Sequence, residues 1–123
     1  MNKTFFCDID GTLLKHHGHS CLHKAMMSPP EILPNVIETL DSWKYNEHCI
    51  ILTTGRPESM RRITEEQLEK VGIFYDMLIM GLPHGERIVV NDNKPTRSET
   101  AIGITVERNK GFTENTFSRI KNE

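Results

Sequence analysis

Two short apolar runs in the first half of the chain predict buried parallel strands. Residues 4–9 (Thr-Phe-Phe-Cys-Asp-Ile) lead into Asp-Gly-Thr, and residues 48–53 (His-Cys-Ile-Ile-Leu-Thr) lead into Thr-Gly-Arg-Pro. Strands that are apolar on both faces are typical of parallel sheets, because helices cover both faces of such sheets. We therefore expect the polar residues that end each run to lie at the carboxyl end of a strand.

Two helices are predicted around these strands. Apolar residues recur at helical spacing over residues 33–43, where Pro34 suits a first helical turn. A second apolar face covers residues 60–71, between a first-turn proline at Pro57 and a typical helix terminator at Gly72. The first helix joins the two strands into a βαβ unit.

Three further strands are predicted near residues 76–80, 87–91 and 102–106. Strands that alternate with helices indicate an α/β fold, here an open, Rossmann-like, mostly parallel sheet flanked by helices. Only residues 81–86 join the third strand to the fourth, whereas a parallel crossover usually takes a dozen residues or more. Six extended residues reach about 20 Å, so a bare crossing is just feasible.

Composition predicts the class of protein. The chain has 123 residues, of which 37% are apolar and 26% charged, and this predicts one globular domain over residues 1–123. No apolar run approaches the ~20 residues that cross a bilayer, and the N-terminus has no signal-peptide pattern. Three cysteines without motif spacing indicate reduced thiols. We expect a cytoplasmic protein without membrane association.

The charge balance bears on the partner. The chain carries 15 Lys and Arg against 17 Asp and Glu, a formal net charge of −2. Proteins that bind nucleic acid without sequence preference usually carry a basic stripe, and the sequence contains none. We therefore expect a small-molecule substrate and regard a nucleic-acid partner as disfavoured.

Three of the five aspartates lie at the carboxyl ends of predicted strands, where ligands bind in open α/β sheets: Asp8, Asp10 and Asp92. Gly11 lets the backbone turn sharply, so that the first two carboxylates can face one cation and one substrate atom. A third carboxylate from another strand would complete an oxygen-rich site of the kind that Mg²⁺ prefers.

Three motifs in the right order resemble those of the haloacid dehalogenase-like (HAD) hydrolase superfamily. Residues 8–14 (Asp-Ile-Asp-Gly-Thr-Leu-Leu) resemble the first motif and residues 50–56 (Ile-Ile-Leu-Thr-Thr-Gly-Arg) the second. Residues 88–92 (Ile-Val-Val-Asn-Asp) resemble the fourth, so the resemblance covers residues 4–94. It implies a phosphatase of the capless branch, because no gap between the predicted strands holds a cap domain.

The resemblance implies a role for each carboxylate. Asp8 is the nucleophile that becomes an aspartyl-phosphate, and Asp10 protonates the leaving oxygen and then activates water. Mg²⁺ is held by the Asp8 side chain, the Asp10 backbone carbonyl and Asp92.

Two assignments stay open at the second motif. Thr54, with Gly55 behind it, is expected to donate its hydroxyl and backbone N–H groups to the phosphoryl oxygens, with Thr53 as the competitor. Arg56 is either a substrate contact or a solvated residue at a helix start.

The cation of the superfamily's third motif is missing from its usual place. Some capless relatives have Gly-Lys-Pro after the third strand, whereas residues 81–83 are Gly-Leu-Pro. Lys94, two residues after Asp92, is the first choice for the catalytic cation. Arg87 is the second choice and a candidate substrate-binding residue, because the start of a strand lies at the far end of the sheet.

Residues 15–33 form a long irregular stretch that we expect to act as a flap beside the site. Its cluster His16, His17, His19, Cys21 and His23 matches no zinc spacing that we can defend.

These features predict a Mg²⁺-dependent phosphomonoester hydrolase that acts on a sugar phosphate or a similar small metabolite. An open site suits a large substrate, or an oligomer whose neighbouring copy closes it. One alternative is a phosphotransferase or nucleic-acid-end phosphatase that uses the same residues. Another is a catalytically silent metal- or phosphate-binding domain, which the presence of both Asp8 and Asp10 argues against and the missing lysine weakly favours.

Overall fold

Three parallel strands form one sheet in the order β1-β2-β3, in a computed structural model that describes residues 2–18, 24 and 27–120. β1 spans Thr4–Asp8, β2 spans Cys49–Thr53 and β3 spans Met77–Ile79. The first two apolar runs therefore pair in parallel as predicted, and the predicted third strand lies beside β2.

The register aligns the carboxyl ends of the three strands. Asp8 pairs with Thr53, and Thr53 pairs with Ile79. The residues that follow each strand consequently emerge along one edge of the sheet, which is where an α/β fold binds its ligands.

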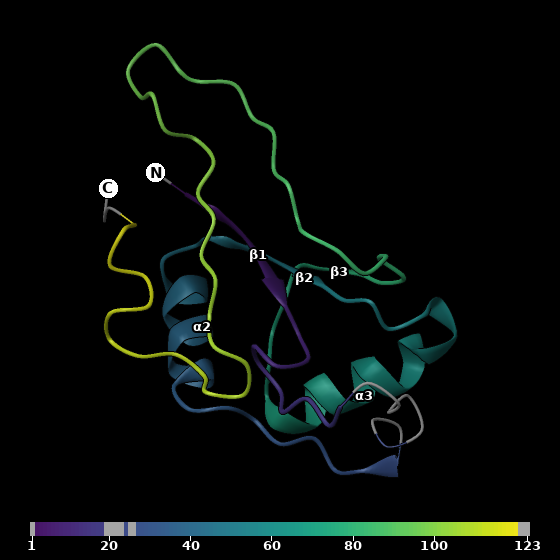
Figure 1. Cartoon of the computed structure of the whole chain (residues 1–123). Helices are drawn as coiled ribbons and strands as arrows, with labels where there is room; N and C mark the ends of the chain where they lie inside the picture. Colours follow the sequence, from purple (N-terminus) through teal and green to yellow (C-terminus); the bar gives the residue numbers. More distant parts are fainter. Residues whose placement is uncertain (1, 19–23, 25–26, 121–123) are drawn as a thin grey trace.

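Two helices cover the strands. α2 spans Val36–Tyr45, and α3 spans Arg61–Val71 after a short 3-10 helix, η1 (Glu58–Met60). In Figure 1, α2 lies to the left of the strands and α3 below and to the right. Gly72, with a φ of 83°, ends α3 as predicted. Among the described residues, no helix is long and apolar enough to cross a membrane.

The core joins both helices to the turn after β1. Ile9, Val36, Leu52 and Leu68 are fully buried and come from that turn, α2, β2 and α3. Full burial of each such side chain contributes about 1.5–3 kcal/mol. The turn that carries the predicted catalytic aspartates is therefore anchored directly in the core.

The segment after residue 106 packs against the start of β1 and α2 through aromatic rings. Phe5 stacks on Trp43 with 3.8 Å between ring centroids, and Phe117 meets Trp43 at 5.2 Å. Phe112 lies 5.0 Å from Phe117 and is only 2% exposed. These contacts hold the C-terminal part of the chain on the domain without a strand.

The predicted fourth and fifth strands are absent from the described residues, where 87–91 and 102–106 are irregular. Ile88 and Val90 are 82% and 91% exposed, on a long segment that extends away from the sheet (Figure 1). The short connection is the notable feature. β3 ends at Ile79, and residues 80–86 are fewer than the dozen or more that a parallel crossover usually takes. Within the described part of the chain, the segment after β3 leaves the sheet and does not pair with the free edge of β1.

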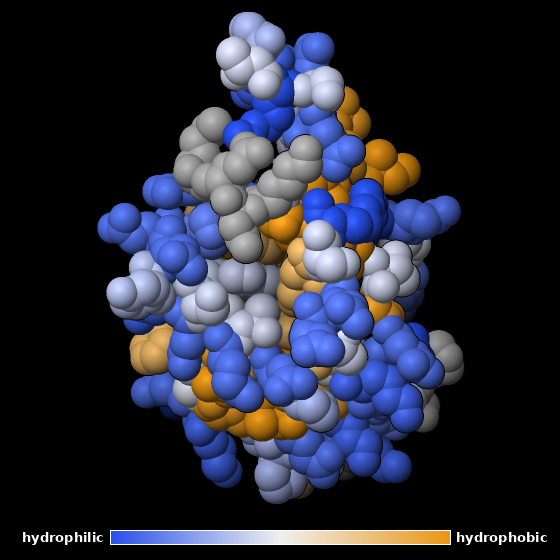
Figure 2. Space-filling model, turned by 90° about the vertical axis from the view of Figure 1, so that its left-hand side faces the viewer, coloured by the Kyte–Doolittle hydropathy of each residue, from blue (hydrophilic) through white to orange (hydrophobic). Residues whose placement is uncertain are grey.

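The same segment leaves apolar surface uncovered. Figure 2 shows a hydrophilic tip at the top of the molecule and apolar surface exposed below it. An apolar run predicts a strand only when an edge lies within reach, so the apolar character of residues 88–90 alone misled the prediction.

Candidate active site

The turn after β1 carries the two predicted catalytic carboxylates. Asp8 is the last residue of β1, and Gly11 has a φ of 91°, a conformation that glycine adopts at little cost. The N–H of Thr12 donates to the Ile9 carbonyl at 3.2 Å and helps to close the turn. This geometry brings Asp10 close enough for its charge to act on Asp8.

Several groups act on the ionisation of Asp8. Its side chain reaches solvent, yet the surrounding protein desolvates it, and this desolvation is the main reason why the pKa of Asp8 lies above its ordinary value. The hydrogen bond from the Thr12 hydroxyl (3.2 Å) lowers the same pKa, the charge of Asp10 raises it and the charge of Arg87 lowers it. A further cation at this point would favour the ionised carboxylate, which is the nucleophilic form.

Arg56 holds Asp10 in a two-point ion pair. Its Nε and Nη2 donate to Asp10 Oδ2 and Oδ1, both at 2.8 Å. Its Nη1 donates to the Thr64 hydroxyl at 3.0 Å and to Gln67 Oε1 at 2.7 Å, both on α3. Arg56 is only 6% exposed, so it is neither a substrate contact nor a solvated residue at a helix start, the two roles that the sequence left open. It is a buried residue that orients a carboxylate.

Thr54 and Gly55 follow β2 at the same edge of the sheet. Thr54 is 1% exposed, its backbone N–H donates to the Ile79 carbonyl at 3.0 Å, and its hydroxyl accepts the Arg56 N–H at 3.1 Å. The hydroxyl proton is not used by these bonds and remains a donor. Thr53 pairs in register with the last residue of β1. The choice between the two threonines stays a prediction.

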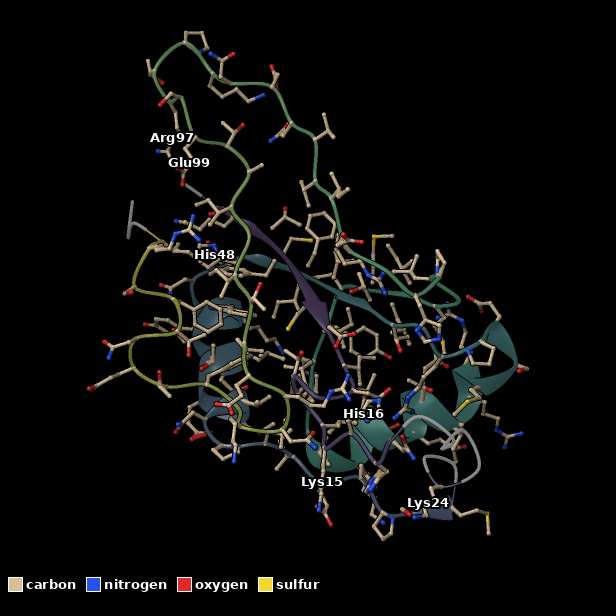
Figure 3. All side chains as sticks on the ribbon, viewed as in Figure 1. Lys15, His16, Lys24, His48, Arg97 and Glu99 are labelled. Carbon is tan, nitrogen blue, oxygen red and sulfur yellow. The ribbon has the colours of Figure 1, made fainter. Side chains whose placement is uncertain are left out.

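Asp92 and Lys94 lie away from the other predicted site residues. Lys94 Nζ contacts Asp92 Oδ1 at 2.8 Å, and both side chains are more than half exposed. The backbone of Lys94 also forms a β-bridge with Arg97, which Figure 3 shows near the top of the molecule, whereas His16 lies in its lower half. His16 is bound to the same residue, Asn109, that binds the turn after Asp10. The structure therefore does not bring Asp92 or Lys94 to the carboxylate pair.

Arg87, the second choice for the missing cation, lies within electrostatic reach of Asp8. Its Nη1 donates to the carbonyls of Pro83 and Gly85, at 3.0 and 3.1 Å. These bonds curl the connection after β3 around the Arg87 side chain.

The donor atoms fit a magnesium ion in kind but not in number. The Asp8 carboxylate and the Asp10 backbone carbonyl are oxygens of the type that Mg²⁺ prefers. In the described part of the chain, however, no three His, Cys, Asp or Glu side chains lie together as a metal site. Asp8 and Asp10 are neighbours in one turn, whereas Asp92 lies away from them, and the predicted ligand set stays a prediction.

Comparison with known families supplies the identity. The sequence profile of the polynucleotide kinase PNKP phosphatase domain matches residues 2–100. The chain belongs to this family. It is therefore a HAD-type phosphatase, as the three motifs predicted.

Two solved structures resemble this PNKP-type domain in fold and sequence. A chain of the Pnkp1/Rnl/Hen1 complex is 30% identical with a TM-score of 0.56, and a chain of the Pnkp1/Rnl/Hen1 RNA repair complex is 31% identical with a TM-score of 0.55. Each match covers 64% of the domain, which spans 27% and 25% of those longer chains.

A third solved structure shares the fold alone. This structural-genomics target from Vibrio cholerae is 22% identical, with a TM-score of 0.52 over 73% of the PNKP-type domain and 80% of its own chain. Among curated proteins, none matches the chain.

One prediction about partners is wrong. The charge balance led us to disfavour nucleic acid, but the matching family is a domain of a polynucleotide kinase, and two similar structures come from an RNA repair complex. A nucleic-acid end presents few phosphates, so a domain that binds one needs only local cations. Net charge averages such cations with distant carboxylates and cannot detect them.

Sequence reasoning also missed the residues that support the PNKP-type site. Thr64 and Gln67 are buried polar residues at positions i and i+3 on α3, and this spacing on an apolar face could have suggested a buried partner. Asn109 binds the catalytic turn from a position 99 residues after Asp10 (109 − 10 = 99), and no local pattern in the sequence reveals such a contact.

The histidine-rich segment of the domain is described only in part. His19, Cys21 and His23 lie outside the described residues. The His16 N–H donates to Asn109 Oδ1 at 2.7 Å, and His16 Nδ1 accepts the Gly18 N–H at 2.9 Å. These bonds give His16 a structural role, and the flap stays a prediction.

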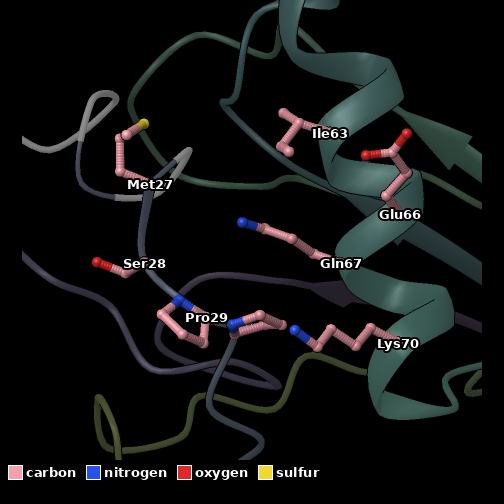
Figure 4. Close-up of a pocket in the computed structure, with 8 residues that line it drawn as sticks. Met27, Ser28, Pro29, Ile63, Glu66, Gln67 and Lys70 are labelled. Atoms are coloured by element: carbon pink, nitrogen blue, oxygen red, sulfur yellow. The ribbon is translucent and has the colours of Figure 1, made fainter.

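A pocket lies between α3 and residues 27–30 (Figure 4). Its volume is about 290 Å³, and Gln67, which accepts from Arg56, is one of its walls. The remaining walls are Met27, Ser28, Pro29, Pro30, Ile63, Glu66 and Lys70. Neither Asp8 nor Asp10 lines this pocket, so the pocket is separate from the carboxylate pair.

Proposed function

We propose that this PNKP-type domain removes the terminal phosphate from a nucleic-acid strand through an aspartyl-phosphate on Asp8. The observation that carries the proposal is the match of residues 2–100 to the phosphatase domain of polynucleotide kinase. The exposure of Asp8 supports it, because the end of a strand must reach the nucleophile from solvent. The match favours strand ends over the sugar phosphates that the sequence first suggested.

The chemistry needs both aspartates. A carboxylate oxygen of Asp8 attacks phosphorus, the bond from phosphorus to the strand oxygen breaks, and Asp10 gives its proton to that oxygen. Water then attacks the phosphorus of the aspartyl-phosphate and gives its proton to Asp10. Inorganic phosphate leaves, and Asp8 and Asp10 return to their starting states.

Two arginines assist these steps from different sides. The two-point ion pair with Arg56 holds the Asp10 carboxyl group in one orientation. Arg87 opposes the negative charge at Asp8 and serves in place of the missing lysine. Thr54 donates its hydroxyl to a phosphoryl oxygen.

Magnesium is the proposed cofactor, because phosphatases of this superfamily generally use it. The Asp8 carboxylate, the Asp10 carbonyl and Asp92 would hold the ion. Its charge would reduce the repulsion between the carboxylate and the phosphate. Asp92 follows Gly81 by 11 residues (92 − 81 = 11), a length that reaches about 36 Å when extended and allows the segment to fold back.

A substrate panel tests the proposal. Phosphate release is measured with Mg²⁺ and with EDTA on short RNA and DNA strands phosphorylated at the 3′ or 5′ end, on sugar phosphates and on an aryl phosphate. We expect Mg²⁺-dependent release, with at least tenfold higher kcat/KM on one type of strand end than on any sugar phosphate. Preference for a sugar phosphate would contradict the proposed substrate, and equal activity in EDTA would contradict the metal.

A further inference from the structure

Arg108 is a cation beside the catalytic turn that the proposed reaction leaves unused. A Cβ atom placed on Gly11 would lie 3.2 Å from Arg108 Cγ and 3.8 Å from its Nε. Gly11 directly follows Asp10, so the stem of the Arg108 side chain passes over the turn that carries both carboxylates. Any larger residue at position 11 would press against this side chain.

The backbone that presents Arg108 is tied to the same turn. The Asn109 N–H donates to the Gly11 carbonyl at 2.9 Å. The Asn109 side chain accepts the His16 N–H at 2.7 Å and donates to the His16 carbonyl at 3.1 Å. Asn109 has a φ of 63°, which asparagine tolerates better than most residues. The hydrogen bonds of Asn109, and not contacts of the Arg108 side chain, therefore fix the position of Arg108.

A second anchor of this segment follows Arg108 in the sequence, at Gly111 and Phe112. Phe112 is buried, and its N–H donates to the Pro34 carbonyl at 2.9 Å. Gly111, with a φ of 71°, packs so closely on Pro34 that a Cβ there would overlap the backbone. Arg108 therefore projects from a segment held against the domain at both ends.

The guanidinium itself is available for a ligand. Arg108 is exposed, and its side chain makes no hydrogen bond or ion pair within the part of the chain that the structure describes. Arginine is always charged, and its planar fork matches phosphate oxygens. The charge of Arg87 acts on the Asp8 carboxylate. Arg108 is therefore available for a second anion, other than the phosphate that Asp8 attacks.

We infer that Arg108 binds the phosphodiester next to the terminal phosphate, and so selects nucleic-acid ends over isolated phosphate esters. The inference rests on the proposed function, because only a strand presents a second phosphate at a defined distance from the first. Contacts of this kind orient a strand on a protein without reading its sequence.

The test compares Arg108→Ala with Lys110→Ala on two substrates. Lys110 is an exposed cation two residues away, so its removal changes the net charge equally. The substrates are an oligonucleotide with a terminal phosphate and the matching nucleoside monophosphate. We expect Arg108→Ala to lower kcat/KM on the oligonucleotide about tenfold and to change kcat/KM on the monophosphate less than twofold. The slope of log kcat/KM against log salt should fall by about 0.7, the value of one single-strand phosphate contact.

The outcomes separate this inference from the proposed function. A wild-type domain that cleaves strand ends and retains this activity in Arg108→Ala overturns the role of Arg108 alone. Equal losses on both substrates, or an equal loss in Lys110→Ala, overturn it as well. A wild-type domain that cleaves no strand end overturns the proposed function and this inference together. Arg108→Lys should recover part of the loss, because it restores the charge without the fork.

Discussion

Ionised Asp8 lowers the stability of the fold, because desolvation raises its pKa above the ordinary value. Below pH about 3.9 the carboxyl is protonated in both the folded and unfolded states, and no penalty arises. As the pH rises through the folded pKa, the folded state must carry a charge that it disfavours. Asp8→Asn should therefore raise the melting temperature at pH 7 without Mg²⁺, and this gain should vanish at pH 3.

Thermal unfolding of both proteins between pH 3 and 8 provides the measurement. The same variant should lose phosphate release, since an amide is a poor nucleophile. A lower melting temperature at pH 7 would mean that the carboxylate is stabilised in the fold, contrary to the direction of its pKa.

The pair of Arg56 and Asp10 offers a test of positioning. Lysine cannot bind Asp10 at two points while also reaching Thr64 and Gln67, so Arg56→Lys should lower kcat about tenfold or more. The pH dependence of kcat should change as well, because Asp10 exchanges the proton. Arg62→Lys is the matched control, since Arg62 lies on α3 with Thr64 and Gln67 and is 93% exposed. A uniform loss at every pH would indicate a merely structural role for Arg56.

Arg87 and Lys94 compete for the role of the missing cation. Arg87 acts on Asp8, whereas Lys94 is bound to Asp92 at 2.8 Å. Arg87→Ala should cost at least tenfold in kcat/KM, about 1.4 kcal/mol of transition-state stabilisation, and Lys94→Ala should cost less. Steady-state kinetics on an aryl phosphate decides between them. A larger loss for Lys94→Ala would restore the first choice made from the sequence.

Among the elements, those with strong local signals were predictable. Both apolar runs became neighbouring strands, and Gly72 ended α3 because a positive φ suits glycine. Asn35, with a φ of 64°, directly precedes α2, which begins at Val36, and its side-chain amide donates to the distant Phe112 carbonyl at 2.6 Å. The irregular conformation of residues 87–91 was not predictable, because an apolar run forms a strand only where it can pair with a strand edge.

The C-terminal segment lacks regular structure, so its aromatic anchor should decide whether it stays in place. Phe112→Ala should lower the free energy of unfolding by about 3–5 kcal/mol, since Phe112 is buried beside Trp43 and Phe117. Tyr45→Ala, at a residue that is 87% exposed, should change it by less than about 0.5 kcal/mol. Urea unfolding measures both variants. Equal effects would show that the segment contributes little to stability.

At the scale of the whole molecule, the order of the motifs revealed the superfamily. The net charge, in contrast, led to the wrong prediction that a nucleic-acid partner is disfavoured. The proximity of Asp8 and Asp10 could be predicted from the sequence, because two positions of one turn are always neighbours. Two other sets of contacts depend on packing across the fold and were not predictable. They are the hydrogen bonds from Arg56 to α3 and the hydrogen bond from Asn109 to Gly11.

The central claim is that the phosphate passes through a covalent bond to Asp8. Asp10→Asn should accumulate this intermediate from an aryl phosphate with Mg²⁺, because its leaving group departs without the Asp10 proton while hydrolysis lacks its base. Acid quenching and peptide mapping by mass spectrometry locate the phosphate. We predict that it is found on Asp8, and phosphate on any other residue would contradict the claim.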